Sequence, residues 1–413
     1  MIVNKFLRTA STRRLLGTIT GVIVAIVAGT AIAIAAQGSG PVPQPKQLAQ
    51  AVHDALAAPK VQGISADVSF TNRLINTSEI KGTDPLLSGG TGHLWLTSDG
   101  QVRLELYGSN GDPTVVVTKT LWWVADPTTS TIYQGTLPAA STSAADKTSS
   151  THSLPTVAQI QNEISKLMSH VNVSGAVPSD VAGQPTYTVT LSPKHDGGLL
   201  GSAELAWDAV HGVPLRAAVY ARGDTTPVLE LAATGVTYGP VDSSIFAISP
   251  PTGGYKVVKV STPSSASAAD KAKNAAKGKH TKKAHVTGVQ AVASHLPFRL
   301  VAPAKLAGLP RQSVTLLDMS GHPAALLTYG QSLGGIAVIE QAATATGTLS
   351  LNGSSTGGDK RGVNLPTVVI GKATGQELDT ALGTLVRFTR AGVTYTVVGS
   401  VTPFAADAAA RAL

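Results

Sequence analysis

Apolar and polar residues alternate along much of the chain, most clearly between residues 204 and 251. Apolar residues recur there at every second position, as in Leu215, Ala217 and Val219, and turn-forming pairs at 211–212, 223–224 and 239–240 separate the runs. A period of two is typical of β-strands, because successive side chains point to opposite faces of the sheet. With a similar region that begins near residue 92, this segment predicts one large, curved antiparallel sheet with a long apolar face.

The same pattern predicts shorter strands before and within this region, listed by number as 64–72, 92–96, 102–107, 114–119, 121–124 and 186–191. Two segments instead have the period of an amphipathic helix, residues 47–58 and residues 156–170. The apolar positions of the second helix share one stripe. Residues 139–153, rich in Ser, Thr and Ala, have no periodicity and are predicted to form a loop.

The chain is predicted to contain two domains, residues 37–260 and residues 291–413. Between them, residues 261–290 are rich in Lys, Ala and Ser and poor in large apolar residues, which is typical of a flexible linker. The second domain is a smaller α+β unit of unknown role, with strands expected at 314–317, 324–329, 336–341, 367–370, 384–389 and 394–398. Thr402 followed by Pro403 predicts the start of a closing helix.

The N-terminal residues predict export and membrane attachment. Residues 1–14 form a basic segment, and residues 15–36 are uncharged and apolar. About 20 apolar residues suffice to cross a bilayer, and the basic flank stays on the cytoplasmic side. We therefore expect a single membrane anchor with the bulk of the chain extracytoplasmic. Small residues at 31–36 leave open the alternative of a cleaved signal peptide and a secreted protein.

The net charge of +8 does not indicate nucleic-acid binding. The linker holds six Lys and one Asp. The combined charge of the basic N-terminal segment and the linker is slightly larger than the net charge of the whole chain. The domains themselves are thus close to neutral, whereas phosphate contacts need a basic surface. The chain has no cysteine, so it cannot be a disulfide scaffold.

Three short patterns resemble catalytic or metal sites. Residues 330–334, GQSLG, match a nucleophile elbow, but no histidine follows His322 and a strand-like run replaces the required helix. We predict a hairpin connection there. The pairs His195 with Asp196 and Asp208 with His211 are too few ligands for zinc, and we expect solvated turn residues. No catalytic residue, metal or cofactor is predicted.

The apolar face admits two interpretations. It is either ordinary core beneath the two helices or the wall of a cavity that an acyl chain enters. The candidate lining residues are the apolar positions of the strands and the stripe of the second helix: Val68, Phe70, Leu94, Leu96, Val102, Leu104, Leu106, Val115, Val117, Val189, Leu191, Leu205, Leu215, Val219, Leu229, Leu231, Ile160, Ile164 and Leu167.

Four stretches carry a resemblance to a known superfamily: GHLWLTSDGQVRLELYG, TLWWVADPTTSTIYQGTLP, AELAWDAVHGVPLRAAVY and VTYGPVDSSIFAISPPTG. Their order, the run 123–127 and the closing Asp242, Phe246 and Pro250 resemble the LolA-like lipoprotein carriers, in the branch that contains the sigma-E regulator RseB. The resemblance covers about residues 47–259. It implies an α+β fold, an unclosed antiparallel β-barrel of about eleven strands with a helical lid, and an interior that binds lipid. The second domain is similar to an uncharacterised α+β domain found behind such modules.

The resemblance implies a non-enzymatic, extracytoplasmic or periplasmic module that binds or carries a lipid, an acyl chain or a lipidated protein. Unlike soluble carriers, this chain is expected to stay on the membrane through its N-terminal helix. An alternative from a different functional class is an RseB-like sensor that binds an anti-sigma factor or another membrane protein. Neither hypothesis involves nucleic acid.

Overall fold

The computed structural model describes residues 40–75, 80–81, 85–137, 155–259, 286–319, 321–343, 362–363 and 365–413. The expected anchor, the expected loop of residues 139–153 and residues 261–285 of the expected linker lie outside these ranges. Within the described ranges, no helix is both long enough and apolar enough to span a bilayer.

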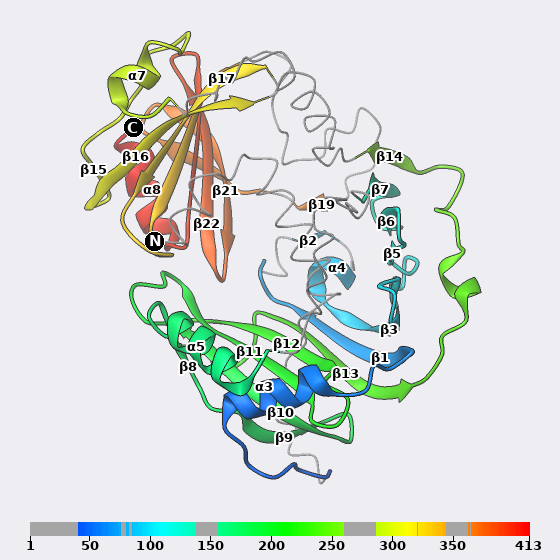
Figure 1. The fold of residues 1–413 in the computed structure, drawn as a ribbon. Coiled ribbons are helices and arrows are strands. Elements are labelled where there is room, and N and C mark those ends of the chain that lie inside the picture. The colour runs from blue at the N-terminus through cyan, green and yellow to red at the C-terminus, as the bar shows by residue number, and fades with distance from the viewer. Residues whose placement is uncertain are drawn as a thin grey trace, which may run out of the picture.

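The first sheet has 13 strands, in the spatial order β14-β7-β6-β5-β4-β3-β1-β13-β12-β11-β10-β8, with β9 beside β10 (Figure 1). The path is not closed, and every pair is antiparallel except β14 with β7. The strands are β1 (Gly63–Asn72), β3 (Gly90–Thr97), β4 (Val102–Leu106), β5 (Thr114–Val117), β6 (Leu121–Asp126), β7 (Thr131–Thr136), β8 (Val171–Val173), β9 (Val177–Val181), β10 (Gln184–Pro193), β11 (Leu200–Asp208), β12 (Pro214–Ala221), β13 (Leu229–Tyr238) and β14 (Lys256–Lys259).

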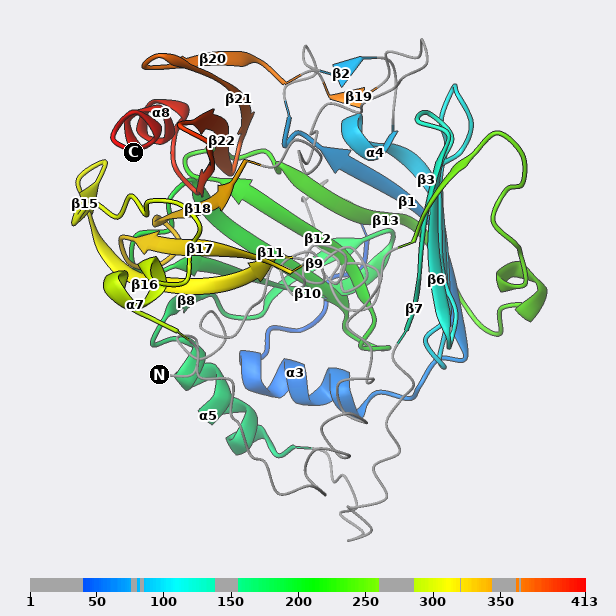
Figure 2. The same cartoon turned by 90° about the horizontal axis from the view of Figure 1, so that it is seen from above.

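The curled sheet has a concave and a convex face. In Figure 2, strands β3 to β7 stand at an angle to β10 to β13, and the segment that follows β13 runs outside β6 and β7. That segment contains a 3₁₀ turn, Ser243–Phe246, and packs Ile248 and Tyr255 against Trp123 and Ile132 on the convex side. Because side chains alternate between faces, the aliphatic residues of β4 point to the concave side.

Two helices pack beside the sheet, at its β8 end. Helix α3 (Leu48–Ala57) covers β10 and β11, and helix α5 (Val157–Leu167) lies against α3 and β8. Thr156 begins α5 with a capping box completed by Gln159, which satisfies two backbone N–H groups that a helix otherwise leaves free. A single turn, α4 (Pro85–Ser88), lies near β1.

The first sheet has two ends with different neighbours. Turns 98–101, 118–120, 182–183 and 209–213 share one end, which we call the proximal end. Turns 108–113, 127–130, 194–199 and 222–228 share the other, the distal end. Gly40 lies at the proximal end, because a Cβ added to it would collide with the carboxylate of Asp180.

The second sheet has eight strands in the order β15-β16-β17-β18-β23-β22-β21-β20. Its elements are α7 (Val289–Ala293), β15 (Lys305–Leu306), β16 (Leu309–Met319), β17 (His322–Tyr329), β18 (Ile336–Ala342), β20 (Thr367–Ile370), β21 (Ala373–Thr380), β22 (Gly383–Arg390), β23 (Val393–Gly399) and α8 (Pro403–Arg411). Helix α8 begins at the expected Thr402 cap and packs on β22 and β23. Strand β21, with the sequence ATGQELDT, was not predicted, because it lacks an apolar alternation.

The expected linker extends too far toward the C-terminus. The N–H of Gly288 donates to the carbonyl of Val314 at 2.9 Å, and the N–H of Leu316 donates to the carbonyl of Val286 at 3.0 Å. Residues 286–290 therefore pack on β16, and α7 begins inside the predicted linker. Their short length and lack of large side chains hid this pairing from the sequence pattern.

The second sheet meets the distal end of the first (Figure 1). The N–H of Leu199 donates to the carbonyl of Ser400 at 3.1 Å, and the N–H of Ala381 donates to the carbonyl of Leu74 at 3.0 Å. A two-residue pairing of β2 (Ile80–Lys81) with β19 (Gly362–Val363) adds a further link. The GQSLG motif takes part as well, because Gly334 touches Asp196 so closely that any Cβ would collide with its carboxylate. The motif is thus the β17–β18 hairpin connection that the sequence predicted.

Candidate functional site

The candidate site is an apolar cluster on the concave face of the first sheet. Eight of the predicted lining residues are buried members of it: Val68, Val102, Leu104, Leu106, Val115, Val117, Leu215 and Leu231. Phe70, Leu94 and Leu96 are half-buried and pack against them. The register places these side chains on one face across β1, β3, β4, β5, β12 and β13. The sequence alternation thus found a continuous aliphatic surface.

The other predicted strand residues lie closer to the helices or are half-buried. Val189 and Leu205 belong to a separate cluster with Tyr187 and Trp207, which α3 covers. The remaining three are half-buried strand residues: Leu191, Val219 and Leu229. These positions are therefore partly core beneath a helix.

The structure does not place the predicted helical stripe over the β3–β4 hairpin. Helix α5 packs on α3 and β8, whereas β4 lies toward the opposite edge of the sheet. Ile160 is buried, but Ile164 is only half-buried and the side chain of Leu167 is 45% exposed. The expectation was wrong because periodicity identifies the apolar side of a helix and not the surface against which it packs.

Six buried members of the concave cluster are absent from the predicted lining residues: Ile64, Ala66, Trp122, Val181, Ala206 and Val213. Trp122 comes from β6, Val181 is the last residue of β9, and Val213 lies in the β11–β12 turn. Val213 lies in a turn, which carries no periodic signal, and only the tertiary structure groups it with the strand residues. The buried hydrophobic residues of this cluster are aliphatic except for Trp122, and the buried carboxylate of Asp208 lies at the margin, where Tyr238 donates to it. An alkyl chain placed around Leu104 would meet aliphatic side chains and Trp122.

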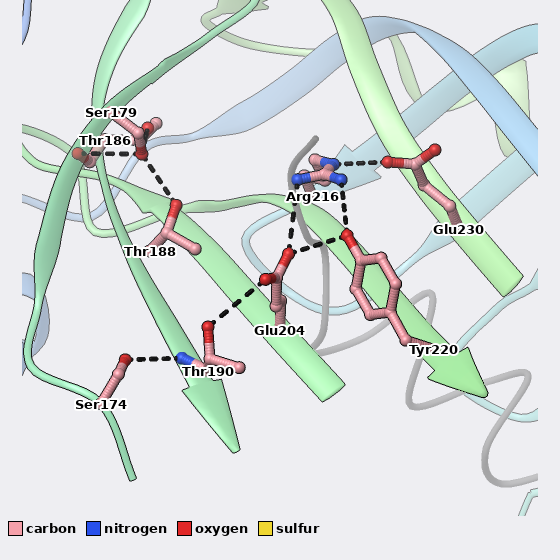
Figure 3. Close-up of polar contacts among 9 residues, drawn as sticks. All are labelled: Ser174, Ser179, Thr186, Thr188, Thr190, Glu204, Arg216, Tyr220 and Glu230. Atoms are coloured by element: carbon pink, nitrogen blue, oxygen red, sulfur yellow. Dashed lines mark hydrogen bonds and ion pairs between the residues drawn. The ribbon is translucent and has the colours of Figure 1, made fainter. Parts of the chain in front are cut away.

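The convex face of the same sheet holds a buried polar network (Figure 3). Arg216 on β12 is 1% exposed and donates from Nε to the carboxylate of Glu230 on β13. Its Nη2 lies 3.3 Å from the hydroxyl of Tyr220, which donates to Glu204 on β11 at 2.9 Å. Burial raises the pKa of Glu230 and lowers that of Arg216, while each charge opposes the shift of the other.

A row of hydroxyl groups extends this network across β10. Thr190 donates to Glu204 at 3.4 Å, and Ser179 lies 2.8 Å from the hydroxyl of Thr186 and 2.7 Å from that of Thr188 (Figure 3). Apart from the Arg216–Tyr220 contact within β12, the links named here join neighbouring strands. These contacts fix the register of β9 to β13, and we assign them a structural role.

Asp208 is not the solvated turn residue that the sequence predicted. It is fully buried and accepts from the N–H of Val210 and of His211, and from the hydroxyl of Tyr238 at 2.6 Å. Burial acts to raise the pKa of Asp208, but these hydrogen bonds and the one from the His211 ring hold it below its usual value. Asp196 is exposed, as expected, and pairs with Arg222. In the described part of the chain, no three acidic or histidine side chains converge as a metal site would require.

A Ser-His-Asp arrangement on the convex face was not visible in the sequence. The hydroxyl of Ser65 lies 2.7 Å from Nε2 of His93, and Nδ1 of His93 lies 2.8 Å from the carboxylate of Asp67. Hydrolysis also needs an oxyanion hole of free N–H groups. Ser65 sits within β1, between β3 and β13, so the backbone N–H groups around it belong to the ladders.

We expect neither Ser65 nor Ser332 to react with a fluorophosphonate probe. Ser65 has no oxyanion hole, and Ser332 has no histidine base downstream. The measurement is covalent labelling of the full chain followed by intact-mass analysis, with a serine protease in the same tube as positive control. Labelling that disappears in Ser65→Ala or Ser332→Ala would contradict this expectation.

Comparisons with known proteins were made on the sequence and on the structure. No model of a protein family matches the chain, and no curated protein matches its sequence. Among solved structures, MucB in complex with MucA(peri) matches at 16% identity over 88% of this chain and 94% of that one, with a TM-score of 0.36. MucB alone matches at 15% identity over 88% and 96%, with a TM-score of 0.34. A putative outer membrane lipoprotein-sorting protein domain from Vibrio parahaemolyticus matches at 11% identity over 48% and 95%, with a TM-score of 0.18.

The sheet itself defines the class of fold. It is an unclosed antiparallel half-barrel with an apolar concave face and helices beside it, in an α+β protein. This is the architecture implied by the sequence resemblance to the LolA-like and RseB-like superfamily, with thirteen strands where about eleven were expected. The predicted fold class, an unclosed antiparallel half-barrel in an α+β protein, is confirmed.

Proposed function

We propose that the chain is a non-enzymatic, extracytoplasmic binding module that holds the acyl chain of a lipid or lipidated protein against its concave face. The observation that carries this proposal is the apolar cluster around Leu104, which is continuous over several strands. Burying a dozen methylenes contributes about 10 kcal/mol at roughly 0.8 kcal/mol each, before the cost of ordering the ligand. Residues 15–36 would keep the module on the membrane.

The test is lipid binding by the full chain, purified in detergent and titrated with a fluorescent palmitate analogue. Leu104→Asn should abolish binding, because it places an amide in the path of the alkyl chain. Leu167→Asn is the matched control. It makes the same change at a side chain that is 45% exposed, and it should bind like the parent.

Thermal melting of the same variants separates a binding surface from solid core. If a ligand occupies the surface, ligand-free Leu104→Asn should melt within a few degrees of the parent while binding is lost. A large drop in melting temperature, of the size expected when about 2–5 kcal/mol of core stability is removed, together with a parent that binds no palmitate, would refute the proposal.

A second candidate function is that of an RseB-like regulator that binds a membrane protein. The observation that favours it is the accessible polar surface on the convex face, where Asp67 is 68% exposed and His93 is 21% exposed. A gene neighbour that encodes a sigma factor with its membrane antagonist would favour this function. A neighbouring lipid exporter would favour the carrier.

A further inference from the structure

The described chain starts at the proximal end of the first sheet. Gly40 touches Asp180 beside the β9–β10 turn, and the hydroxyl of Tyr187 donates to the carbonyl of Gln44 at 2.5 Å. Lys46 then forms an isolated antiparallel β-bridge with Ala176. These contacts fix the segment before α3 along the edge of the sheet, at the bottom of Figure 1 and away from the second sheet.

Very little chain separates Gly40 from the apolar stretch that precedes it. Residues 15–36 are uncharged and apolar, and only residues 37–39 lie between. At roughly 3.3–3.6 Å per residue, even a fully extended connection spans no more than about 14 Å. If residues 15–36 cross the bilayer, the proximal end must therefore lie within reach of the lipid headgroups.

The proximal end exposes large aliphatic side chains. Val210 in the β11–β12 turn is 59% exposed, and Leu121 at the start of β6 is 42% exposed. Leu56, near the end of α3, is 53% exposed, and the neighbouring carbonyl of Ala55 touches Gly212 of the same turn. Val42, two residues after Gly40, is 58% exposed. Aliphatic side chains on the rim of a folded unit are favoured at the boundary between headgroups and acyl chains.

The apolar cluster of the concave face also reaches this end. Val102, Val117 and Trp122 flank the proximal turns 98–101 and 118–120, and Val181 and Val213 flank the other two. The second sheet contacts the distal end instead. The chain start, the four exposed aliphatic residues named above and one margin of the apolar cluster therefore lie at the same end of the first sheet.

We propose that the proximal end docks on the outer surface of the lipid bilayer, with Val42, Leu56, Leu121 and Val210 inserted among the headgroups. The inference rests on the proposed function, because it takes residues 15–36 as an anchor. To the proposed function, this inference adds the source from which the bound acyl chain comes. An acyl chain enters the concave face directly from the facing leaflet and not from solution, and the second sheet points away from the membrane.

The test uses single cysteines in the full chain, which has none of its own. Leu56→Cys, Leu121→Cys and Val210→Cys carry an environment-sensitive fluorophore at the proximal end. Tyr107→Cys, 53% exposed at the distal end, and Phe404→Cys, 85% exposed on α8, are matched controls. The protein is reconstituted into vesicles of phosphatidylethanolamine and phosphatidylglycerol, with and without nitroxide-labelled lipid.

The proximal labels should be quenched several-fold more by nitroxide lipid than the distal labels, and several-fold less by aqueous iodide. If the chain resists an alkaline wash but all five labels respond alike, the docking inference is overturned while the anchor stands. If the wash releases the chain, the anchor assumed in the proposed function fails, and the inference fails with it. A protein that binds no palmitate but still shows the expected quenching would refute the proposed lipid binding and leave the docking inference standing.

Discussion

Replacing Arg216 with alanine should lower the free energy of unfolding of the first sheet by about 3–5 kcal/mol, the usual consequence of leaving a buried charge without its partner. Arg216 is 1% exposed, and the side chain of Glu230, which it contacts, is only 11% exposed. Without the guanidinium, Glu230 must either stay ionised in a poor solvent or take up a proton. Burial already raises the pKa of Glu230, so the variant should lose the most stability at neutral and higher pH.

Denaturant unfolding followed by tryptophan fluorescence measures this effect. All four tryptophans lie in the first sheet, at Trp95, Trp122, Trp123 and Trp207, so the signal reports on that sheet alone. Arg222→Ala is the matched control. Its ion pair with Asp196 is 58% and 60% exposed, and such pairs contribute about 0–1 kcal/mol.

A rescue variant distinguishes lost charge pairing from lost packing. Arg216→Met combined with Glu230→Gln and Glu204→Gln removes the charges but keeps the volume, and it should recover most of the stability. Equal unfolding midpoints for Arg216→Ala and Arg222→Ala would show that the network does not stabilise the sheet.

Glu340→Gln should stabilise the second sheet by up to about 3 kcal/mol at pH 8 and by little at pH 4.5. Glu340 is fully buried on β18, where it accepts from the N–H of Val301 at 3.0 Å. Burial raises the pKa of this carboxyl from 4.5 to about 7, although the Val301 hydrogen bond acts to lower it. Each pKa unit corresponds to about 1.4 kcal/mol.

The direction with pH follows from proton binding in the two states. Below about pH 4.5, Glu340 is protonated in both states and the sheet keeps its full stability. As the pH rises toward 7, the unfolded state releases the proton while the folded state retains it, so stability is lost. Glutamine carries no charge and keeps an acceptor for Val301, so its stability should not follow this fall.

Calorimetry at pH 5 and pH 8 checks the prediction. Because all four tryptophans lie in the first sheet, the calorimetric transition of the second sheet is the one at which tryptophan fluorescence does not change. Glu163→Gln on α5 is the control, because its side chain is 71% exposed. A parent protein whose second sheet is equally stable at both pH values would contradict the assignment to Glu340.

The candidate site shows how far the sequence pattern carries. The alternation in β4 placed Val102, Leu104 and Leu106 on one face, and the structure groups them in one cluster. The alternation did not show which other segments of the chain pack against that face. Val181 joins it from the end of β9 and Val213 from a turn, and α5 does not cover it. A strand specifies its own two faces, but the surface opposite is chosen by segments far away in the chain.

The polar contacts were even less accessible to sequence reasoning. Ser65 and His93 are 28 residues apart, and Arg216 and Glu230 are 14 apart, so only the strand register brings each pair together. Arg216 occupies an alternating position that is typical of a solvated face, yet it is buried. The burial of a side chain depends on its neighbours in space, which local composition does not encode.

The sequence by itself determined the elements with a strong local signal. These are the alternating strands, the amphipathic helix of residues 156–170, the helix begun by Thr402, and the large curved antiparallel sheet, whereas the half-barrel was implied by the family resemblance. Periodicity and capping act within a few residues, so they can be read without the fold. Only the tertiary structure decided where α5 docks, that Arg216 and Asp208 are buried, and that Gly334 lies against Asp196. Each of these depends on long-range packing, in which distant segments compete for the same surface and the curl of the sheet selects among them.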